Sequence, residues 1–155
     1  MSRHALITGA GSGIGRQVAH RFAELGFRVT LVDINPEALA AVAEECRAAG
    51  ADDATVLAAD LANPTGPGDV VARAWAEAPV DVLVNSAGIY PATPFLSLDA
   101  ATWDAVQNLN TRAPLLATVA LAQRAIEAGR GASVVNISSG AALRARPGAA
   151  PYSTS

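Results

Sequence analysis

The chain has 155 residues, of which 51% are hydrophobic and 16% are charged, so it is long enough for one domain with a core and too apolar for a disordered segment. A net charge of −3 offers no positive footprint for nucleic acid or an anionic membrane surface. No apolar run approaches the about 18 residues of a membrane span, and the single cysteine, Cys46, excludes an internal disulfide. Since no signal peptide is predicted before the first strand, the cytoplasm is the expected location.

The most informative stretch lies near the N-terminus, where an apolar run leads into a glycine-rich turn. Residues 5–7 predict a short buried strand, and the turn follows from Thr8 to Gly15. From Arg16 to Leu25 the spacing of the apolar residues predicts a helix with Leu25 on its apolar face. A helix N-terminus has unpaired N–H groups and a positive dipole end, and glycines let a pyrophosphate approach the backbone. Strand, turn and helix together predict a phosphate-binding loop.

Strands alternate with helices along the rest of the chain. Strands are predicted at 28–33, 55–59, 80–84 and 133–137, and helices at 36–49, 70–77 and about 100–128, the last interrupted near Pro114. The helix at 36–49 has Asn35 as its N-cap and ends near Gly50. The strands are apolar throughout rather than alternating, which indicates a parallel sheet covered by helices on both faces. We therefore expect one doubly wound α/β domain (a Rossmann fold) over residues 1–155, with strand order 3-2-1-4-5.

Polar or glycine residues follow all five predicted strands, and in such a sheet ligands bind outside the carboxyl ends of the strands. These residues are Thr8 to Gly15, Asp33, Asp60, Asn85 to Gly88, and Ser138-Ser139. Ordinary turn chemistry would explain Asp60 or Asn85 taken singly, but the recurrence at five strand ends predicts a ligand site. Asp33 can accept hydrogen bonds from both ribose hydroxyls and would repel a 2′-phosphate, which favours NAD over NADP as the cofactor.

Four motifs resemble those of the short-chain dehydrogenase/reductase family, and together they cover almost the whole chain. They are Thr8-Gly9-x3-Gly13-Ile14-Gly15, Asn85-Ser86-Ala87-Gly88, Val134 to Ser139, and Pro151 to Ser155, which is similar to the start of the family's Tyr-x3-Lys motif. The second motif departs from the family's Asn-Asn-Ala-Gly turn in having Ser86 in place of the second asparagine. The resemblance implies an NAD-dependent oxidoreductase that transfers hydride between a nicotinamide cofactor and a small alcohol or carbonyl substrate.

The resemblance also implies roles for individual residues. Tyr152 would be the general acid/base, Ser139 would hydrogen-bond the substrate oxygen, and Asn110 would hold a water of the proton relay. The implied cofactor contacts come from Gly9, Gly11, Ser12, Gly13, Ile14, Gly15, Asp33, Asp60, Leu61, Asn85, Ala87, Gly88 and Tyr152. No metal site is expected, because His4 and His20 are isolated and Cys46 lies on a helix face typical of a core.

The family's lysine would stand at the position after Ser155, and the chain contains no lysine at all. The helix that Tyr152 would begin, the last strands of the sheet and the substrate-covering loop are likewise expected outside the sequence, leaving the fifth strand as an exposed apolar edge. We therefore expect the N-terminal part of a longer homo-oligomeric enzyme, with little or no activity in these 155 residues alone. The alternative is a short protein that binds NAD(H) without turnover. A methyltransferase using S-adenosylmethionine would leave Asn110, Ser139 and Tyr152 unexplained.

Overall fold

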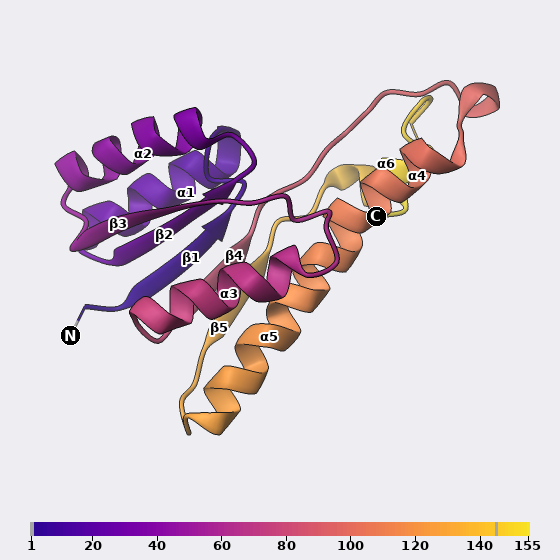
Figure 1. Cartoon of the computed structure of the whole chain (residues 1–155). Helices are drawn as coiled ribbons and strands as arrows, with labels where there is room; N and C mark the ends of the chain where they lie inside the picture. The colour runs from indigo at the N-terminus through magenta and orange to yellow at the C-terminus, as the bar shows by residue number, and fades with distance from the viewer. Residues whose placement is uncertain (1, 145) are drawn as a thin grey trace.

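The computed structural model describes residues 2–144 and 146–155, and within them five parallel strands form one sheet (Figure 1). The strands are β1 (His4–Thr8), β2 (Arg28–Asp33), β3 (Asp53–Ala58), β4 (Val82–Asn85) and β5 (Ser133–Asn136). Their order is β3-β2-β1-β4-β5, and all four neighbouring pairs run parallel. The predicted doubly wound α/β topology is confirmed, and its switch point lies between β1 and β4.

Helices cover both faces of this sheet. They are α1 (Gly13–Glu24), α2 (Pro36–Ala49), α3 (Gly66–Glu77), α4 (Ala100–Gln107), α5 (Ala113–Glu127) and α6 (Ala150–Ser153), with a π-helical turn η2 (Asn108–Arg112) and the 3-10 turns η1 (Phe95–Ser97) and η3 (Gly140–Ala142). In Figure 1, α1 and α2 lie on one side of the sheet and α3 and α5 on the other. The core is accordingly divided into two layers, one on each face of the sheet.

Alternate residues of each central strand supply the two core layers. In β1, Ala5 and Ile7 pack toward α1 and α2, whereas Leu6 packs toward α3 and α5. All five residues of this strand are buried. A strand that is covered on both faces buries side chains on both, which is why residues 5–7 form a continuous apolar run. The buried polar residues at its two ends, His4 and Thr8, make side-chain hydrogen bonds.

The predicted caps of α2 are confirmed. The side chain of Asn35 accepts hydrogen bonds from the N–H groups of Glu37 and Ala38, and Pro36 occupies the first turn, where its missing N–H is not needed. The helix ends at Gly50, whose φ of 109° lies in the left-handed region. Cys46 is buried on the inner face of α2, and this burial raises the pKa of its thiol.

Several predicted boundaries are wrong by a few residues. The helix predicted at Arg16–Leu25 is α1, which begins at Gly13 because Ser12 is its N-cap, and Leu25 lies beyond its end with 55% of its surface exposed. The strand predicted at 55–59 starts at Asp53, which pairs with Arg28 of β2. The strands predicted at 80–84 and 133–137 are observed at Val82–Asn85 and Ser133–Asn136, and the helix predicted at 70–77 begins at Gly66. Pairing with a neighbouring strand extends β3 to Asp53, and element ends are the part of a local sequence pattern that is least well defined.

The helical region at 100–128 is interrupted upstream of the predicted position. The break is the π-helical turn η2, and Pro114 lies within the first turn of α5, where a proline is tolerated. A π-turn widens the helix locally and commonly lies at a functional site. This turn contains Asn110, one of the predicted catalytic residues.

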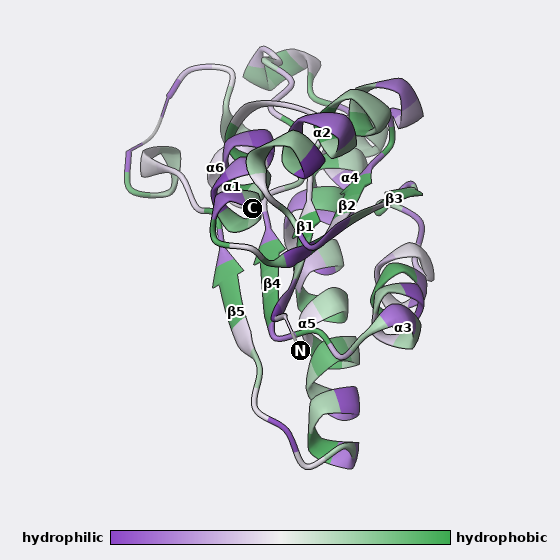
Figure 2. Ribbon diagram, turned by 90° about the vertical axis from the view of Figure 1, so that its left-hand side faces the viewer, coloured by the Kyte–Doolittle hydropathy of each residue, from purple (hydrophilic) through white to green (hydrophobic). Residues whose placement is uncertain are grey.

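Strand β5 is the outer edge of the sheet, as predicted. Figure 2 shows β5 as the outermost arrow, beside β4, with colours that are largely those of hydrophobic residues. Its four residues are all exposed, including Val134 and Val135. One expectation about this region is wrong: the chain already forms the beginning of a helix around Tyr152, because α6 spans Ala150–Ser153.

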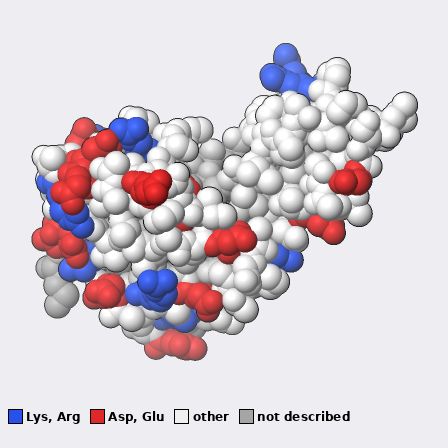
Figure 3. All heavy atoms as spheres, turned by 45° about the horizontal axis from the view of Figure 1, so that its top comes forward, with Lys and Arg blue, Asp and Glu red and all other residues white. Residues whose placement is uncertain are grey.

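Charged side chains of both signs are interspersed over the end formed by α1, α2 and β3, whereas the end formed by α4 and α6 is largely uncharged on the face shown in Figure 3. Between α1 and α2, Glu45 accepts hydrogen bonds from His20 and Arg16, which hold the pKa of its carboxyl below the usual value.

Among the described residues, no helix combines the length and apolarity that a membrane crossing requires.

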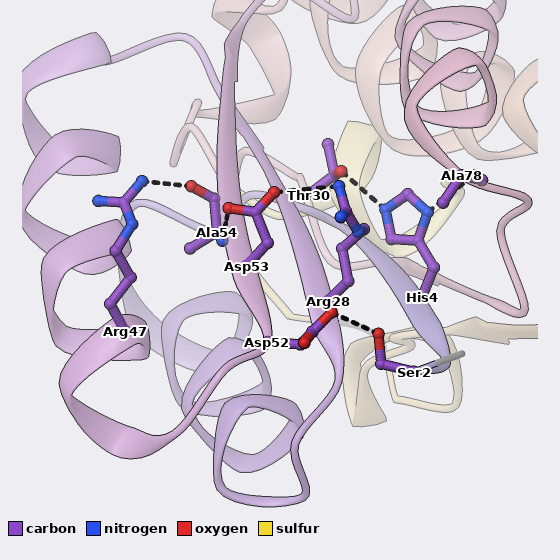
Figure 4. A network of polar contacts seen from close by, with 9 residues as sticks. All are labelled: Ser2, His4, Arg28, Thr30, Arg47, Asp52, Asp53, Ala54 and Ala78. Atoms are coloured by element: carbon purple, nitrogen blue, oxygen red, sulfur yellow. Dashed lines mark hydrogen bonds and ion pairs between the residues drawn. The ribbon is translucent and has the colours of Figure 1, made fainter.

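A polar network joins the strands at the amino-terminal edge of the sheet (Figure 4). The imidazole of His4 contacts the Ala78 carbonyl through Nδ1 at 2.9 Å and the Thr30 hydroxyl through Nε2 at 2.8 Å. Because a carbonyl only accepts, Nδ1 carries a proton, whereas the Thr30 hydroxyl can either donate to Nε2 or accept from it. Burial lowers the pKa of His4, which favours the neutral imidazole, with Nε2 accepting from Thr30.

Candidate active site

The loop between β1 and α1 is built on glycines with positive φ. Gly9 and Gly13 have φ angles of 66° and 54°. The loop is held by two hydrogen bonds: the Ala10 N–H donates to the Val32 carbonyl at 3.0 Å, and the Gly11 N–H donates to a carboxylate oxygen of Asp33, also at 3.0 Å. The loop is thus fixed to the carboxyl end of β2.

Close backbone approaches explain why two of these positions need glycine. A Cβ on Gly9 would lie 2.8 Å from the backbone of Ala87, and a Cβ on Gly15 would collide with the carbonyl oxygen of Gly9. At Gly13, by contrast, no heavy atom lies within 4 Å of where a Cβ would be. The backbone at Gly13 therefore borders open space, which fits the close approach of a phosphate.

The first turn of α1 can bind an anion. Its N-cap, Ser12, makes no side-chain capping hydrogen bond, and the turn contains no acidic residue. The first N–H groups of a helix have no intrahelical partner, and the helix dipole places positive potential there. The N–H groups following Ser12 could therefore hold the pyrophosphate of a dinucleotide.

Thr8 connects this loop to the turn that follows β4. Its hydroxyl oxygen accepts hydrogen bonds from the N–H groups of Ser86 and Ala87 at 3.0 and 3.1 Å. Asn85 continues the connection across the sheet, because its side-chain amide donates to Asn136 of β5 at 2.8 Å. The carboxyl ends of β1, β4 and β5 are thereby held in register.

Asp33 and Asp60 lie at the carboxyl ends of β2 and β3. The Asp33 carboxylate accepts from the N–H groups of Gly11 and Asn35, so that it faces the glycine loop. The Asp60 carboxylate accepts from the Ala62 N–H, which is ordinary turn chemistry. Both side chains are free to accept further hydrogen bonds, since a carboxylate has about four lone-pair sites.

Asn110 clamps the segment that follows β4. Its side-chain oxygen accepts from the Ile89 N–H at 2.9 Å, and its amide nitrogen donates to the Ile89 carbonyl at 3.0 Å. The same nitrogen donates to the hydroxyl of Ser155 at 3.1 Å. The π-helical turn thus presents Asn110 to two segments that are distant in sequence.

The segment around Tyr152 is held by the same helix. Gln107 donates to the Pro151 carbonyl at 3.0 Å, and Thr111 donates to the carbonyl of Ser155 at 3.4 Å. Tyr152 is half-buried on α6. Ser139, after β5, is also half-buried, and its oxygen accepts from the Ala141 N–H at 3.1 Å, which leaves its hydroxyl proton available to a substrate oxygen.

One open cavity of about 1050 Å³ at the carboxyl edge of the sheet brings most of the predicted residues together. Asn110, Ser139 and Tyr152 line it, and so do the following predicted cofactor contacts: Gly9, Ser12, Gly13, Ile14, Asp33, Asp60, Leu61, Asn85, Ala87 and Gly88. Gly11 and Gly15 do not line it. They shape the loop from beneath, Gly11 through Asp33 and Gly15 through its contact with Gly9.

Sequence reasoning missed the contacts of two residues that the structure places in this site. Thr8 bonds the turn after β4, a contact between residues 78 and 79 positions apart. Tyr90 also lines the cavity, and its ring lies against that of Tyr152. The sequence signal for Tyr90 was that it lies two residues after the motif Asn85 to Gly88.

Comparison with known proteins gives the family of this chain. A family model described as short chain dehydrogenase matches residues 3–155. The chain therefore belongs to the short-chain dehydrogenase family, a class of nicotinamide-dependent oxidoreductases that act on alcohols and carbonyl compounds.

Two curated relatives illustrate the range of the family. The chain is 38% identical over 135 residues to galactitol 2-dehydrogenase (L-tagatose-forming) of Cereibacter sphaeroides, covering 87% of this chain and 52% of the relative. It is 32% identical over 153 residues to 3beta-hydroxysteroid dehydrogenase 2 of Eggerthella lenta, covering 97% of this chain and 58% of the relative. The chain thus spans just over half the length of these relatives, whose named substrates differ widely.

A solved structure agrees with the fold. A metagenomic short-chain oxidoreductase in complex with NADP superposes with a TM-score of 0.90 at 36% identity, covering 98% of this chain and 69% of that one. The fold and the order of the strands in the sheet are thus those of a member of the family.

Proposed function

We propose that this chain supplies the cofactor site and the acid/base residues of an NAD-dependent oxidoreductase that interconverts an alcohol and a carbonyl compound. The observation that carries the proposal is the cavity, because the glycine loop and Asp33 line it together with Asn110, Ser139 and Tyr152. The glycine loop suits a dinucleotide, since open space borders Gly13 and the first turn of α1 is uncapped and free of acidic residues.

The chemistry is divided between the cofactor and these side chains. A bound nicotinamide accepts or supplies the hydride. The Tyr152 phenol exchanges the proton of the substrate oxygen, and the hydroxyl of Ser139 donates a hydrogen bond to that oxygen. Asn110 fixes the backbone of Ile89, and in the proposed mechanism it also holds a water that connects the site to solvent.

The preference for NAD is argued from charge. The carboxylate of Asp33 lies at the end of β2 beside the glycine loop, where it would accept hydrogen bonds from the ribose hydroxyls of NAD and repel the 2′-phosphate of NADP. The structurally similar metagenomic enzyme holds NADP, so the preference of this chain rests on Asp33 alone.

Hydride transfer tests the proposal directly. NADH absorbance is followed with a panel of alcohols and ketones, for the 155-residue chain and for any longer product of its gene. We expect turnover in the longer form, and Tyr152→Phe should lower kcat by about 10²- to 10⁴-fold, whereas NADH binding should be retained. Turnover that survives in Tyr152→Phe would contradict the assigned role.

The second candidate is binding of NAD(H) without turnover, which is the function expected if no lysine lies beside Tyr152. A neighbouring lysine would favour the ionised form of a tyrosine. Lack of turnover in every form of the protein that binds NADH would establish this second function instead.

We also propose that the protein works in the cytoplasm and that it is a homo-oligomer. The homo-oligomer is supported by the apolar side chains of Leu115, Val119 and Ile126, which are exposed along α5.

A further inference from the structure

We propose that Tyr90 is a positioning residue for Tyr152, holding the ring of the proposed acid/base in its working orientation. The inference rests on the proposed function of Tyr152. The ring centroids of the two tyrosines lie 4.6 Å apart, with an angle of 45° between the ring planes. The separation lies within the range at which aromatic rings attract one another, and the tilt avoids the unfavourable face-to-face arrangement.

Both sides of Tyr90 are tied to the structure through the backbone. Ile89, the preceding residue, has its N–H and its carbonyl bonded to the side chain of Asn110. Thr93, three residues further on, donates its N–H to the carbonyl of Gly148 at 3.0 Å. Gly148 itself has a φ of 73°, so a turn brings this carbonyl back to the segment that holds Tyr90. The backbone on both sides of Tyr90 is therefore held by hydrogen bonds.

A continuous series of contacts, called the circuit below, leads from Tyr152 back to Tyr90. The Ser155 hydroxyl donates to the carbonyl of Tyr152 at 2.8 Å and accepts from the amide of Asn110. Asn110 in turn holds Ile89, the neighbour of Tyr90. The ring contact between Tyr90 and Tyr152 completes this circuit, so that the orientation of Tyr152 depends on the segment after β4 as well as on α6.

Tyr152 lines the open cavity and is only half-buried, so its ring needs a neighbour that restricts its rotamers. A displacement of about 1 Å at a reacting group can cost roughly 10²-fold in rate. The ring of Tyr90 limits the movement of the Tyr152 ring on one side, while half of the surface of Tyr90 remains exposed. The contact uses the ring faces and edges, so a phenylalanine at position 90 should serve as well as tyrosine.

The first part of the test observes the contact in the full chain, which contains two tyrosines. With ring-labelled tyrosine, Tyr90→Phe leaves Tyr152 as the sole labelled ring in the NMR spectrum. We expect its resonances to stay shifted by the neighbouring ring in Tyr90→Phe and to move toward those of free tyrosine in Tyr90→Leu. Resonances that coincide in the two variants would overturn the proposal. If Tyr90→Leu does not fold, the reciprocal pair Tyr152→Phe and Tyr152→Leu reports the same contact from Tyr90.

The second part measures catalysis in the form that turns substrate over. We expect Tyr90→Leu to lower kcat roughly 10- to 100-fold with the KM for NADH unchanged, and Tyr90→Phe to restore the wild-type value. Equal losses in both variants, or an unchanged kcat in Tyr90→Leu, would contradict a positioning role. Absence of turnover in the parent protein would overturn the proposed function itself, a result distinguishable from failure of the ring contact because the NMR measurement does not depend on turnover.

Discussion

Asp33 is the residue on which the proposed preference for NAD rests. Its carboxylate lies at the end of β2, bonded to the N–H groups of Gly11 and Asn35, and it lines the cavity. A 2′-phosphate at this place would meet a like charge, and like charges in contact at a binding site cost several kcal/mol. The same carboxylate is a good acceptor for two ribose hydroxyls, so on this proposal a single side chain would both bind NAD and repel NADP.

We expect Asp33→Asn to shift the ratio of the NADP and NAD dissociation constants toward NADP by about 10- to 100-fold. Asparagine has nearly the same shape and keeps an acceptor oxygen, so the change reports the charge. Fluorescence titration with NADH and NADPH measures the ratio. The matched control is Asp60→Asn, another cavity carboxylate, which should leave the ratio unchanged. NADPH binding as tight as NADH binding in the parent chain would contradict the assignment.

Many of the cavity residues that could be predicted from the sequence lie at the ends of predicted strands, whereas Asn110 and Tyr152 were predicted from the family resemblance alone. Parallel topology then brings Asp33, Asp60 and Asn85 to one edge, whatever the details of packing. Thr8 and Tyr90 could not be given their roles in this way. Their partners, the N–H groups after β4 and the ring of Tyr152, become neighbours only through the tertiary fold.

At the scale of elements, the strands were predictable because the sheet is covered on both faces and each central strand is an apolar run. The helix α2 was predictable to the residue, since its caps Asn35 and Gly50 are local signals. The π-helical turn was not, because it depends on the contact of Asn110 with Ile89, which lies in another segment. The edges of β3 and β4 were set by their neighbouring strands rather than by their own sequences.

The amino-terminal edge of the sheet makes stability depend on pH. Burial lowers the pKa of His4 in the folded chain below its ordinary value of 6.5. Between these two pKa values the unfolded chain binds more protons than the folded chain. His4 therefore does not reduce the free energy of unfolding above about pH 6.5, but reduces it progressively as the pH falls toward the pKa of the folded chain. The charged groups near this imidazole are Arg28, which lowers its pKa, and Asp81 and Asp53, which raise it.

We expect the urea midpoint of unfolding to decrease from about pH 7.5 to pH 5, and the decrease to be smaller in His4→Gln, which has no titrating imidazole at this place. The control is His20→Gln, which removes the imidazole on α1 and should keep the pH dependence that arises from His4. An identical pH dependence in the parent chain and His4→Gln would show that His4 is not the group responsible.

At the scale of the whole molecule, function and stability are separated between the two edges of the sheet. The carboxyl edge holds the glycine loop, the cavity and the three proposed catalytic residues. The amino-terminal edge holds the His4 network, which joins β1 to β2 and to the segment before β4 (Figure 4). The exposed strand β5 lies beside the cavity, and its uncovered apolar side chains are consistent with further structure or a second subunit packing there in the working enzyme.

The central claim is that a dinucleotide binds across the carboxyl edge with its pyrophosphate at Gly13. The most direct test is titration of the chain with NADH, comparing the parent with Gly13→Ala and with Gly26→Ala as the matched control. Both glycines have positive φ and open space where a Cβ would lie, so the two substitutions impose similar backbone strain, but only Gly13 lines the cavity. We predict micromolar binding by the parent and by Gly26→Ala, and binding about 10-fold weaker or worse in Gly13→Ala. A parent chain that does not bind NADH, or that loses nothing in Gly13→Ala, would contradict the account.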